Sequence, residues 1–153
     1  MNVQEIMTTD VETCRLDDTL NSPAAIMWGH DCGVVPVVDD DGRVVGMITD
    51  RDICMAAYTQ GAPLSAIRVA NACSRTLRAC RLDDPIEEAE AIMAAAQVRR
   101  LPVIDREGRL FGVVSLSDLV QHARPDDKKP DGLSFDRVAA TLAAISHPTH
   151  ATA

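Results

Sequence analysis

The chain has 153 residues, a formal net charge of −8 and a hydrophobic fraction of 46%, which is ordinary for a globular protein. The negative charge argues against nucleic acid as the main partner, because duplex binding needs a basic surface. No apolar run is long enough to span a membrane, and the start of the chain lacks the basic and apolar regions of a signal peptide. We therefore expect a cytoplasmic protein.

The cysteines and histidines do not follow the spacing of a metal site. The cysteine count is odd and no C-x-x-C pair occurs, so neither a zinc site nor a disulfide framework is indicated. The sequence predicts no metal site, and it favours small, buried thiols at the five cysteines, Cys14, Cys32, Cys54, Cys73 and Cys80.

An internal repeat organises the chain. Residues 3–55 overlay residues 69–121 at a constant offset of 66, without a gap. Cys-Arg-Leu-Asp-Asp at 14–18 recurs at 80–84, and Ala-Ile-Met at 25–27 recurs at 91–93. The Pro-Val that begins at Pro36 recurs at Pro102. This run of matches indicates a duplication.

Each repeat is predicted to have the order β-α-β-β-α. In the first, a strand over 11–14 precedes a helix that opens at 17–19 and places Leu20, Ala24, Met27 and Trp28 on one face. Two strands over 34–38 and 43–48 then form a hairpin, followed by a helix over about 50–58. The second repeat has the corresponding strand at 77–80 and its last helix at about 116–123.

These elements predict an α/β (α+β) fold of two pseudo-symmetric repeats packed as one module. A unit of three strands cannot bury both faces of its sheet alone, so the copies are expected to share a face. The boundaries are 1–60 for the first repeat, 61–68 for a linker, 69–123 for the second repeat and 124–153 for a second linker and a C-terminal helix. We expect the exposed helices to pair with another chain as a homodimer.

The C-terminal segment is predicted to be an amphipathic helix after a linker at 124–130. Ser134 can cap this helix, and His147-Pro148 can end it. Its apolar stripe would consist of Phe135, Val138, Leu142 and Ile145. The helix can dock on its own body, on a partner chain or on a target protein.

Two segments, 46–52 and 112–118, share the pattern G-h-h-[ST]-x-x-D, where h is apolar, at a predicted strand-to-helix junction. Such a junction can bind an anion or a polyol, because backbone N–H groups face outward there. Thr49 or Ser115 could bond a phosphate or ribose oxygen, and a glycine at 46 or 112 could let a flat base approach the backbone. Alternatively, Thr49-x-x-Asp52 and its copy are capping boxes that serve only the helix.

The repeated pattern resembles the CBS (cystathionine-β-synthase) domain, which usually occurs as a tandem pair called a Bateman module. The resemblance covers residues 3–121, and Gly-Val-Val-Ser-Leu-Ser-Asp-Leu at 112–119 is similar to the ribose-phosphate motif of that family. It implies that AMP, ADP, ATP or S-adenosylmethionine binds in clefts between the repeats. The residues that it implies for nucleotide binding are Thr49, Arg51, Asp52, Ser115, Ser117, Asp118, Arg99, Arg100, Thr9, Val11, Cys32, Gly33, Val35, Ser74, Leu77 and Val98.

The resemblance implies distinct roles for these residues. Asp52 and Asp118 would hold the ribose rings, and the arginines would meet phosphates, although these arginines are equally explained as solvated charges. Arg99-Arg100 has Gly33-Val34 as its counterpart in the first repeat, so the two sites are expected to be unequal. Asn21-Ser22-Pro23 and Trp28 depart from the family pattern and could reshape the first half.

The sequence favours a non-catalytic sensor in which an adenine nucleotide regulates a signalling partner that the sequence does not identify. It carries no nucleophile–base–orienter set, no P-loop and no G-x-G-x-x-G, so we do not expect an enzyme. The alternative is a ligand-free structural or dimerisation module that mediates protein–protein interaction. Retention of the hydroxyl and the carboxylate in both motifs favours the sensor.

Overall fold

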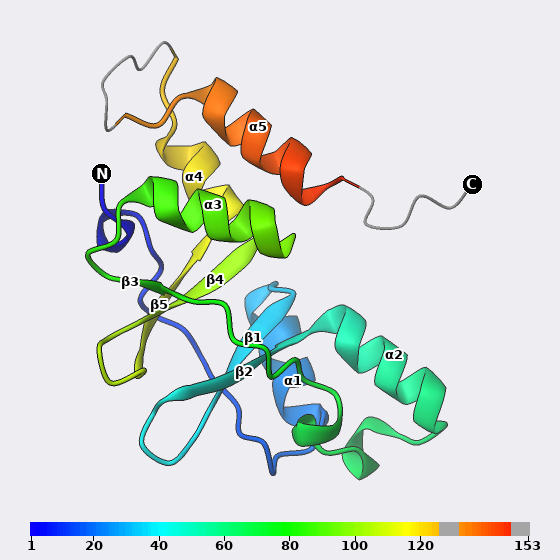
Figure 1. Cartoon of the computed structure of the whole chain (residues 1–153). Helices are drawn as coiled ribbons and strands as arrows, with labels where there is room; N and C mark the ends of the chain where they lie inside the picture. Colours follow the sequence, from blue (N-terminus) through cyan, green and yellow to red (C-terminus); the bar gives the residue numbers. More distant parts are fainter. Residues whose placement is uncertain (126–131, 148–153) are drawn as a thin grey trace. The chain divides into compact units, whose positions relative to one another are not determined.

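The computed structural model describes residues 1–125 and 132–147 and has a mixed α+β architecture. Its elements follow in the order η1 Val3–Glu5, α1 Asn21–His30, β1 Val34–Val38, β2 Val44–Thr49, α2 Asp50–Gln60, η2 Leu64–Ala66, η3 Val69–Asn71, β3 Cys80–Arg81, α3 Ile86–Ala96, β4 Arg100–Ile104, β5 Leu110–Ser115, α4 Leu116–His122 and α5 Phe135–Ile145 (Figure 1). None of the helices in the described part of the chain is both long and apolar enough to cross a membrane.

The chain divides into two compact units whose limits cut across the sequence repeats. Unit 1 contains residues 1–9, 78–105 and the chain from 111 onward, and unit 2 contains residues 10–77 and 106–110. The opening segment of each repeat therefore packs with the body of the other repeat. In Figure 1 the N-terminal segment, drawn in blue, lies beside β3 and α3.

Backbone hydrogen bonds join the opening segment of each repeat, residues 1–9 or 69–77, to the body of the other repeat; we call these the exchanged segments. Equivalent bonds in the two units involve residues that are 66 positions apart. In unit 1 the N–H of Val3 donates to the carbonyl of Asp84 at 3.0 Å. In unit 2 the N–H of Val69 donates to the carbonyl of Asp18 at 2.8 Å. The next residue in each segment makes the equivalent bond, from Gln4 to the carbonyl of Leu82 and from Ala70 to the carbonyl of Leu16. The two units therefore have the same backbone contacts at equivalent positions.

Each unit has a small sheet. In unit 2, β1 and β2 pair antiparallel with Val34 opposite Thr49, and Cys14 forms a parallel bridge to Val37. In unit 1 the strand order is β3-β4-β5, and β3 runs parallel to β4. The predicted strand over 11–14 is thus reduced to the bridge at Cys14, and the predicted strand over 77–80 begins only at Cys80. Both segments start where the chain passes from one unit to the other.

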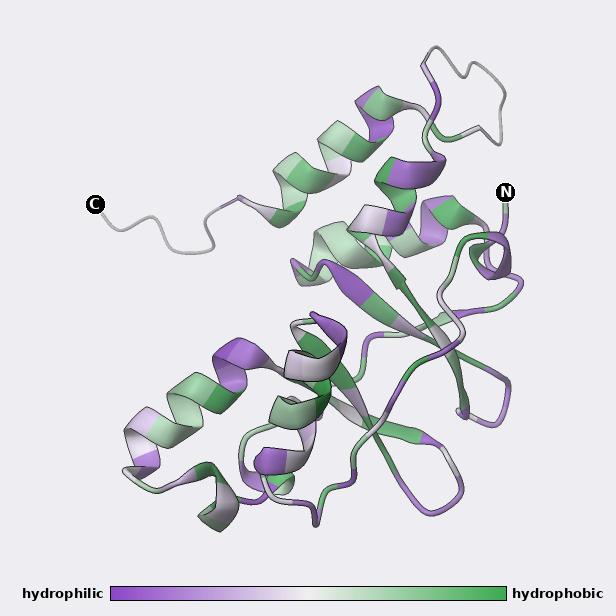
Figure 2. Ribbon diagram, turned by 180° about the vertical axis from the view of Figure 1, so that it is seen from behind, coloured by the Kyte–Doolittle hydropathy of each residue, from purple (hydrophilic) through white to green (hydrophobic). Residues whose placement is uncertain are grey.

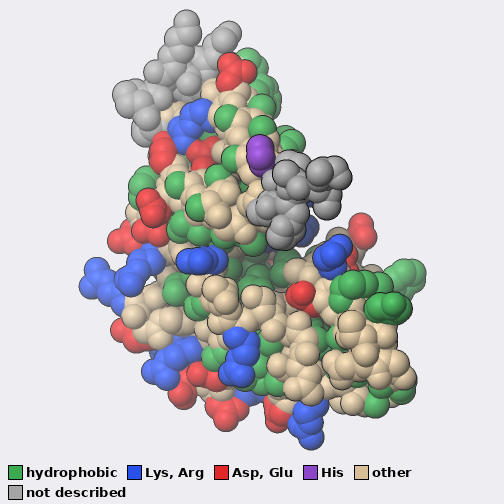
Figure 3. Space-filling view, turned by 45° about the vertical axis from the view of Figure 1, so that its right-hand side comes forward, with side chains coloured by type: hydrophobic (Ala, Val, Ile, Leu, Met, Phe, Trp, Pro, Cys, Tyr) green, Lys and Arg blue, Asp and Glu red, His purple; other side chains and the backbone are tan. Residues whose placement is uncertain are grey.

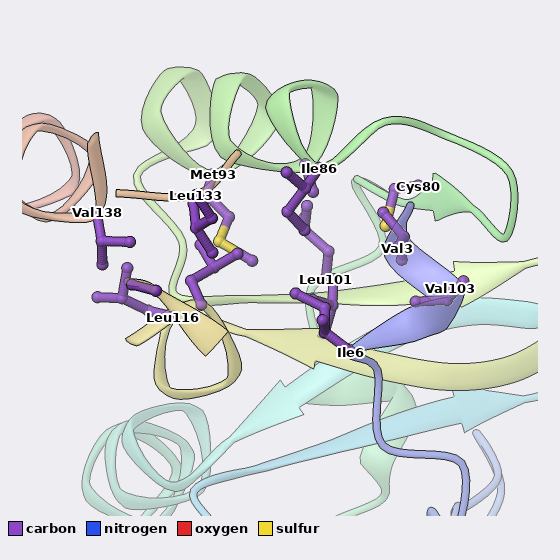
Figure 4. Packing of buried hydrophobic residues seen from close by; sticks show 14 of the residues in the cluster. Val3, Ile6, Cys80, Ile86, Met93, Leu101, Val103, Leu116, Leu133 and Val138 are labelled. Atoms are coloured by element: carbon purple, nitrogen blue, oxygen red, sulfur yellow. The ribbon is translucent and has the colours of Figure 1, made fainter. Parts of the chain in front are cut away.

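The hydrophobic core of unit 1 joins three distant parts of the chain. Val3 and Ile6 come from the exchanged segment, and Leu101 and Val103 come from β4 (Figure 4). Val138 adds a side chain from α5. Unit 2 has its own cluster, which includes Cys14, Leu20, Met27, Val35, Val37, Ile48, Ile67 and Val69. Figure 2 shows the hydrophobic residues concentrated in the strands and hydrophilic ones in the hairpin turns.

Helix α1 departs from the predicted apolar face. Leu20 and Met27 are buried as predicted, but Trp28 is 91% exposed. A residue that directly follows Met27 lies about 100° further around the helix, so both cannot face the same core. Helix α2 continues to Gln60, slightly beyond its predicted end at about 58, and is capped by Gly61, whose positive φ of 59° suits glycine.

Helix α5 packs on α3 and α4 of its own chain. The hydroxyl of Ser134 accepts the N–H of Arg137, which confirms the predicted cap. The buried stripe, however, is Val138, Thr141 and Ile145, whereas the predicted Phe135 and Leu142 are 48% and 42% exposed. Most of the predicted linker over 124–130, and Pro148, lie outside the described residues.

Polar contacts explain why the stripe is displaced. Arg137 pairs with Glu87 at 3.0 Å and also with Glu90, whose side chain is only 8% exposed. The hydroxyl of Thr141 donates to Glu90 at 3.2 Å. Burial alone would lower the pKa of Arg137, but its hydrogen bonds and ion pairs with the two glutamates raise it, so the guanidinium remains charged. Ion pairs and hydrogen bonds with the glutamates of α3, as well as apolar contacts, therefore determine which face of α5 packs on α3.

Candidate functional site

The junction between β2 and α2 in unit 2 is built by a capping box. The N–H of Thr49 donates to Asp52 Oδ2 at 2.9 Å, and the N–H of Asp52 donates to Thr49 Oγ1 at 3.1 Å. Thr49 has extended backbone angles and ends the strand, so the next residue starts the helix. The box therefore fixes the hydroxyl and the carboxylate side by side at the junction.

The junction between β5 and α4 in unit 1 repeats this arrangement. The N–H of Ser115 donates to Asp118 Oδ2 at 2.7 Å, and the N–H of Asp118 donates to Ser115 Oγ at 3.2 Å. The Ser115 hydroxyl also donates to Asp118 Oδ2 at 2.6 Å. The hydroxyl proton is therefore used within this junction, whereas the Thr49 hydroxyl has no such contact with Asp52 among the hydrogen bonds of the described chain.

Capping and ligand binding are compatible at both junctions. In each box, only the Oδ2 oxygen of the aspartate takes part. Within residues 1–125 and 132–147, the Oδ1 oxygen of Asp52 and that of Asp118 accept no hydrogen bond. Both side chains are partly exposed. Each junction thus has one carboxylate oxygen that can accept a hydrogen bond from a hydroxyl group of a bound molecule.

Gly46 and Gly112 have a different role from the predicted one. A Cβ at Gly46 would lie 2.7 Å from the carbonyl oxygen of Ser74, and a Cβ at Gly112 would lie 2.5 Å from that of Thr8. The chain's own backbone fills this space, since Met47 pairs with Ser74 and Val113 pairs with Thr8 in antiparallel bridges. The glycines therefore admit the exchanged segments, and the expectation that they leave room for a flat base is wrong.

The segment before each hairpin is tied to the start of the helix. The N–H of Asp50 donates to the carbonyl of Gly33 at 3.1 Å in unit 2. In unit 1 the N–H of Leu116 donates to the carbonyl of Arg99 at 2.9 Å. Because of this bond, Arg99 starts directly beside the box formed by Ser115 and Asp118, and Arg100 follows it in β4.

The remaining predicted site residues divide between the units. Thr9, Val98 and Ser117 belong to unit 1, and the members in unit 2 are Val11, Cys32, Gly33, Val35, Arg51, Ser74 and Leu77. Val35 is fully buried in the core of unit 2, so its side chain is not accessible to a ligand. No hydrogen bond or bridge among the described residues joins Val11 or Leu77 to a junction.

Sequence reasoning missed one charged residue, Asp50. Its carboxylate lies beside Gly33 and accepts the N–H of Arg51 at 2.8 Å. The signal was present in the alignment of the two repeats, because the residue equivalent to Asp50 is the apolar Leu116. A position that is charged in one copy and apolar in the other indicates a local difference between two otherwise equivalent junctions.

The cysteines do not contribute chemistry to either junction. Burial raises the pKa of Cys14 and of Cys80 to about 12, so both thiols stay protonated and unreactive at neutral pH. The pKa of Cys73 is raised as well, mainly by burial. Among the described residues, no group of three or more His, Cys, Asp or Glu side chains is arranged to hold a metal ion.

Comparisons with known proteins agree with the duplicated architecture. The CBS domain family matches the chain twice, at residues 3–58 and 69–124. The CBS domain-containing protein YhcV of Bacillus subtilis is 33% identical over 146 residues, which cover 95% of this chain and 96% of that protein. Hypoxic response protein 1 of Mycobacterium tuberculosis is 33% identical over 78% of this chain and 82% of its own.

Solved structures show the same fold. The crystal structure of Hypoxic Response Protein I with two coordinated zinc ions has a TM-score of 0.74 and 31% identity, covering 81% of this chain and all of that one. The CBS domain pair of protein MJ0100, in complex with 5′-methylthioadenosine and S-adenosyl-L-methionine, has a TM-score of 0.71 and 23% identity. It covers 79% of this chain and 94% of its own. The chain belongs to the CBS domain family.

Proposed function

We propose that this chain is a non-catalytic regulatory module that binds an adenosyl ligand at its two strand-to-helix junctions. The observation that carries the proposal is the aspartate of each capping box, which serves the helix with Oδ2 and keeps Oδ1 available. Capping uses one oxygen of the carboxylate, and the other can accept a hydrogen bond from one of the two neighbouring hydroxyls of a ribose. The complex of the MJ0100 domain pair with 5′-methylthioadenosine and S-adenosyl-L-methionine supports this class of ligand.

The proposed roles follow from the chemistry of each side chain. Asp52 and Asp118 accept hydrogen bonds from the ribose hydroxyls in units 2 and 1. The hydroxyl of Thr49 can donate to a ribose or phosphate oxygen while its Oγ1 still accepts the N–H of Asp52. Phosphates of AMP, ADP or ATP would meet Arg51, Arg99 or Arg100, since guanidinium groups bind phosphate in two-pronged geometry. S-adenosylmethionine is the alternative ligand.

Regulation would require that the ligand binds two arrangements of the module with different affinity. A ligand with equal affinity for both arrangements would shift nothing. The regulated protein is then the one that contacts the favoured arrangement. This mechanism needs no catalytic group and no covalent step, so the module would act as a sensor of adenosyl metabolites.

Calorimetric titration tests the proposal. AMP, ADP, ATP and S-adenosylmethionine are titrated into the native chain and into Asp52→Ala and Asp118→Ala. Each substitution should remove one site or weaken it about tenfold or more, because a hydrogen bond to a charged group contributes about 1.5 kcal/mol. A matched control is Ser134→Ala, which removes the cap of α5, a helix that carries none of the proposed ligand-binding residues.

The control separates capping from binding. Ser134→Ala should lower stability by about 1 kcal/mol, as the loss of a helix cap does, without changing affinity for the ligand. If the native chain binds none of the four compounds, and the two aspartate variants only lower stability as the control does, the boxes are helix caps and the proposal is wrong.

A specific surface favours a second role, homodimerisation. Trp28 on α1 is 91% exposed and Tyr58 on α2 is 81% exposed, and the two helices contact each other in unit 2. Large exposed aromatic side chains are typical of protein interfaces. We propose that the α1–α2 surface pairs two copies of the chain. Sedimentation equilibrium should then give a dimer for the native chain and a monomer for Trp28→Ala.

The surface charge of the chain disfavours binding of nucleic acid. On the face shown in Figure 3, basic side chains lie among acidic ones. The formal charge of −8 acts in the same direction.

A further inference from the structure

The two junctions differ in charge at one pair of equivalent positions. Gly33 and Arg99 occupy the same place in the repeat, and the carbonyl of each accepts the first N–H of the following helix. The side chain that starts here is absent in unit 2 and is a guanidinium in unit 1. The next residue continues the difference, since Val34 stands where unit 1 has Arg100.

A carboxylate takes the place of the missing side chain in unit 2. A Cβ built on Gly33 would lie 3.1 Å from Oδ2 of Asp50 and 3.5 Å from its Cγ. The carboxylate of Asp50 thus lies in tight contact with the position at which the side chain of Arg99 starts in unit 1. The equivalent of Asp50 in unit 1 is Leu116, which is buried in the hydrophobic core and leaves no charge at the junction.

The orientation of Asp50 is held by its own helix. Its Oδ1 accepts the N–H of Arg51 at 2.8 Å, which directs Oδ2 towards Gly33. The junction of unit 2 therefore carries two carboxylates, Asp50 and Asp52, and one guanidinium, Arg51. The junction of unit 1 carries one carboxylate, Asp118, and two guanidiniums, Arg99 and Arg100. Over the residues named here, the formal charge is −1 in unit 2 and +1 in unit 1.

We infer that the two junctions select adenosyl ligands of different charge. The unit 1 junction takes a ligand with a 5′-phosphate, because two guanidinium groups can neutralise a phosphate dianion. The unit 2 junction takes a ligand whose 5′ substituent is neutral or cationic, such as a thioether or a sulfonium, so that of the three arginines only Arg99 and Arg100 meet a phosphate. The carboxylate of Asp50 repels a phosphate and attracts a cation. This inference rests on the proposed function and assigns a ligand class to each of its sites.

Titrations with ligands of matched shape test the assignment. AMP supplies the phosphate and 5′-methylthioadenosine supplies the neutral thioether. The native chain should bind one AMP per chain, and Arg99→Gly should weaken that site at least about tenfold while leaving the thioether nucleoside unaffected. Added salt should weaken AMP more than it weakens 5′-methylthioadenosine.

An exchange between the repeats supplies the decisive variant. Gly33→Arg with Asp50→Leu gives unit 2 the pair that unit 1 already contains, and removing the carboxylate clears the space beside position 33. This double variant should bind two AMP per chain. Asp50→Asn keeps the shape of the side chain and should raise AMP affinity at the unit 2 junction at least about tenfold, so the inference remains testable if the double variant does not fold.

The possible outcomes separate the inference from the proposed function. The inference is wrong if the native chain binds two AMP with similar affinity and Asp52→Ala and Asp118→Ala each remove one. It is equally wrong if Asp50→Asn leaves AMP binding unchanged. If neither AMP nor 5′-methylthioadenosine nor S-adenosylmethionine binds the native chain, the proposed function fails, and this inference fails with it.

Discussion

Gly112 lies so close to the carbonyl oxygen of Thr8 that a Cβ at this position would stand 2.5 Å from it. The two segments are joined by a pair of backbone hydrogen bonds between Thr8 and Val113, each 2.9 Å long. Contact at this distance is possible only for glycine, since the neighbouring atom is backbone and cannot rotate away. Gly46 and Ser74 have the same relationship in unit 2.

Gly112→Ala should therefore lower the free energy of unfolding by about 1–3 kcal/mol, because the added methyl group forces the exchanged segment away from β5. Urea denaturation monitored by circular dichroism measures the change. Gly29→Ala is the matched control, since a Cβ there meets nothing within 4 Å. The control should be neutral or stabilising by up to about 1 kcal/mol. Equal effects of the two substitutions would contradict the assigned role of Gly112.

The exchange of segments predicts that Val3 stabilises unit 1, although it belongs to the first repeat. Val3→Ala removes two buried methyl groups and should cost about 2 kcal/mol of unfolding free energy. Val69→Ala should cost a similar amount in unit 2, where Val69 is also fully buried. Hydrogen exchange locates each effect: Val3→Ala should deprotect the amides of β4, and Val69→Ala those of β1. Deprotection confined to the substituted repeat would contradict the exchange.

The contact between Arg137 and Glu90 predicts a large penalty for removing one partner. Arg137→Met leaves Glu90 as a buried carboxylate without its cation, and such a loss costs about 3 kcal/mol. Replacing both residues, as Arg137→Met with Glu90→Leu, should recover part of the loss in thermal denaturation. Asp41→Ala breaks the exposed pair with Arg43 and should cost less than about 1 kcal/mol. A similar cost for Arg137→Met would show that Glu90 does not depend on the pair.

The buried thiols predict a fall in stability at high pH. The folded-state pKa values of Cys14 and Cys80 are about 12, above the ordinary thiol value of 9.0, so the unfolded chain loses these protons first. Their contribution is complete below about pH 9 and is lost as the pH rises to about 12, at about 1.4 kcal/mol per pH unit for each thiol.

Urea denaturation at several pH values checks the slope, and Cys14→Ala with Cys80→Ala should make it shallower. Thiol labelling at pH 8 gives an independent test. Exposed Cys54 should react quickly, whereas Cys14 and Cys80 should react only after unfolding. Rapid labelling of all five cysteines in the folded chain would contradict the assigned burial.

The repeat predicted the secondary structure of the body well, and the reason is local. Hairpin strands at 34–38 and 44–49 and helices that start at Asp50 and Leu116 follow from alternating apolar residues and from the two boxes. The exchange could not be predicted in this way. Asp18 and Asp84 are equivalent in sequence, so a repeat alone does not decide which of them Val3 will contact.

One error arises where polar contacts override the apolar pattern. The stripe of α5 was predicted through Leu142, but Glu90 draws Arg137 and Thr141 inward and leaves Leu142 exposed. At the candidate site, the sequence predicts the capping boxes only as an alternative to ligand-binding roles for the same residues. The available oxygen of each aspartate, and the carboxylate of Asp50 beside Gly33, depend on side-chain direction, which residue spacing does not encode.

The contacts of α5 with α3 depend on residues that differ between the two repeats. The acceptors of Arg137 on α3, Glu87 and Glu90, have Asn21 and Ala24 as their equivalents on α1. The equivalent helices of the two repeats are α1 and α3, and only α3 carries these glutamates. Their ion pairs with Arg137 therefore favour the packing of α5 on α3.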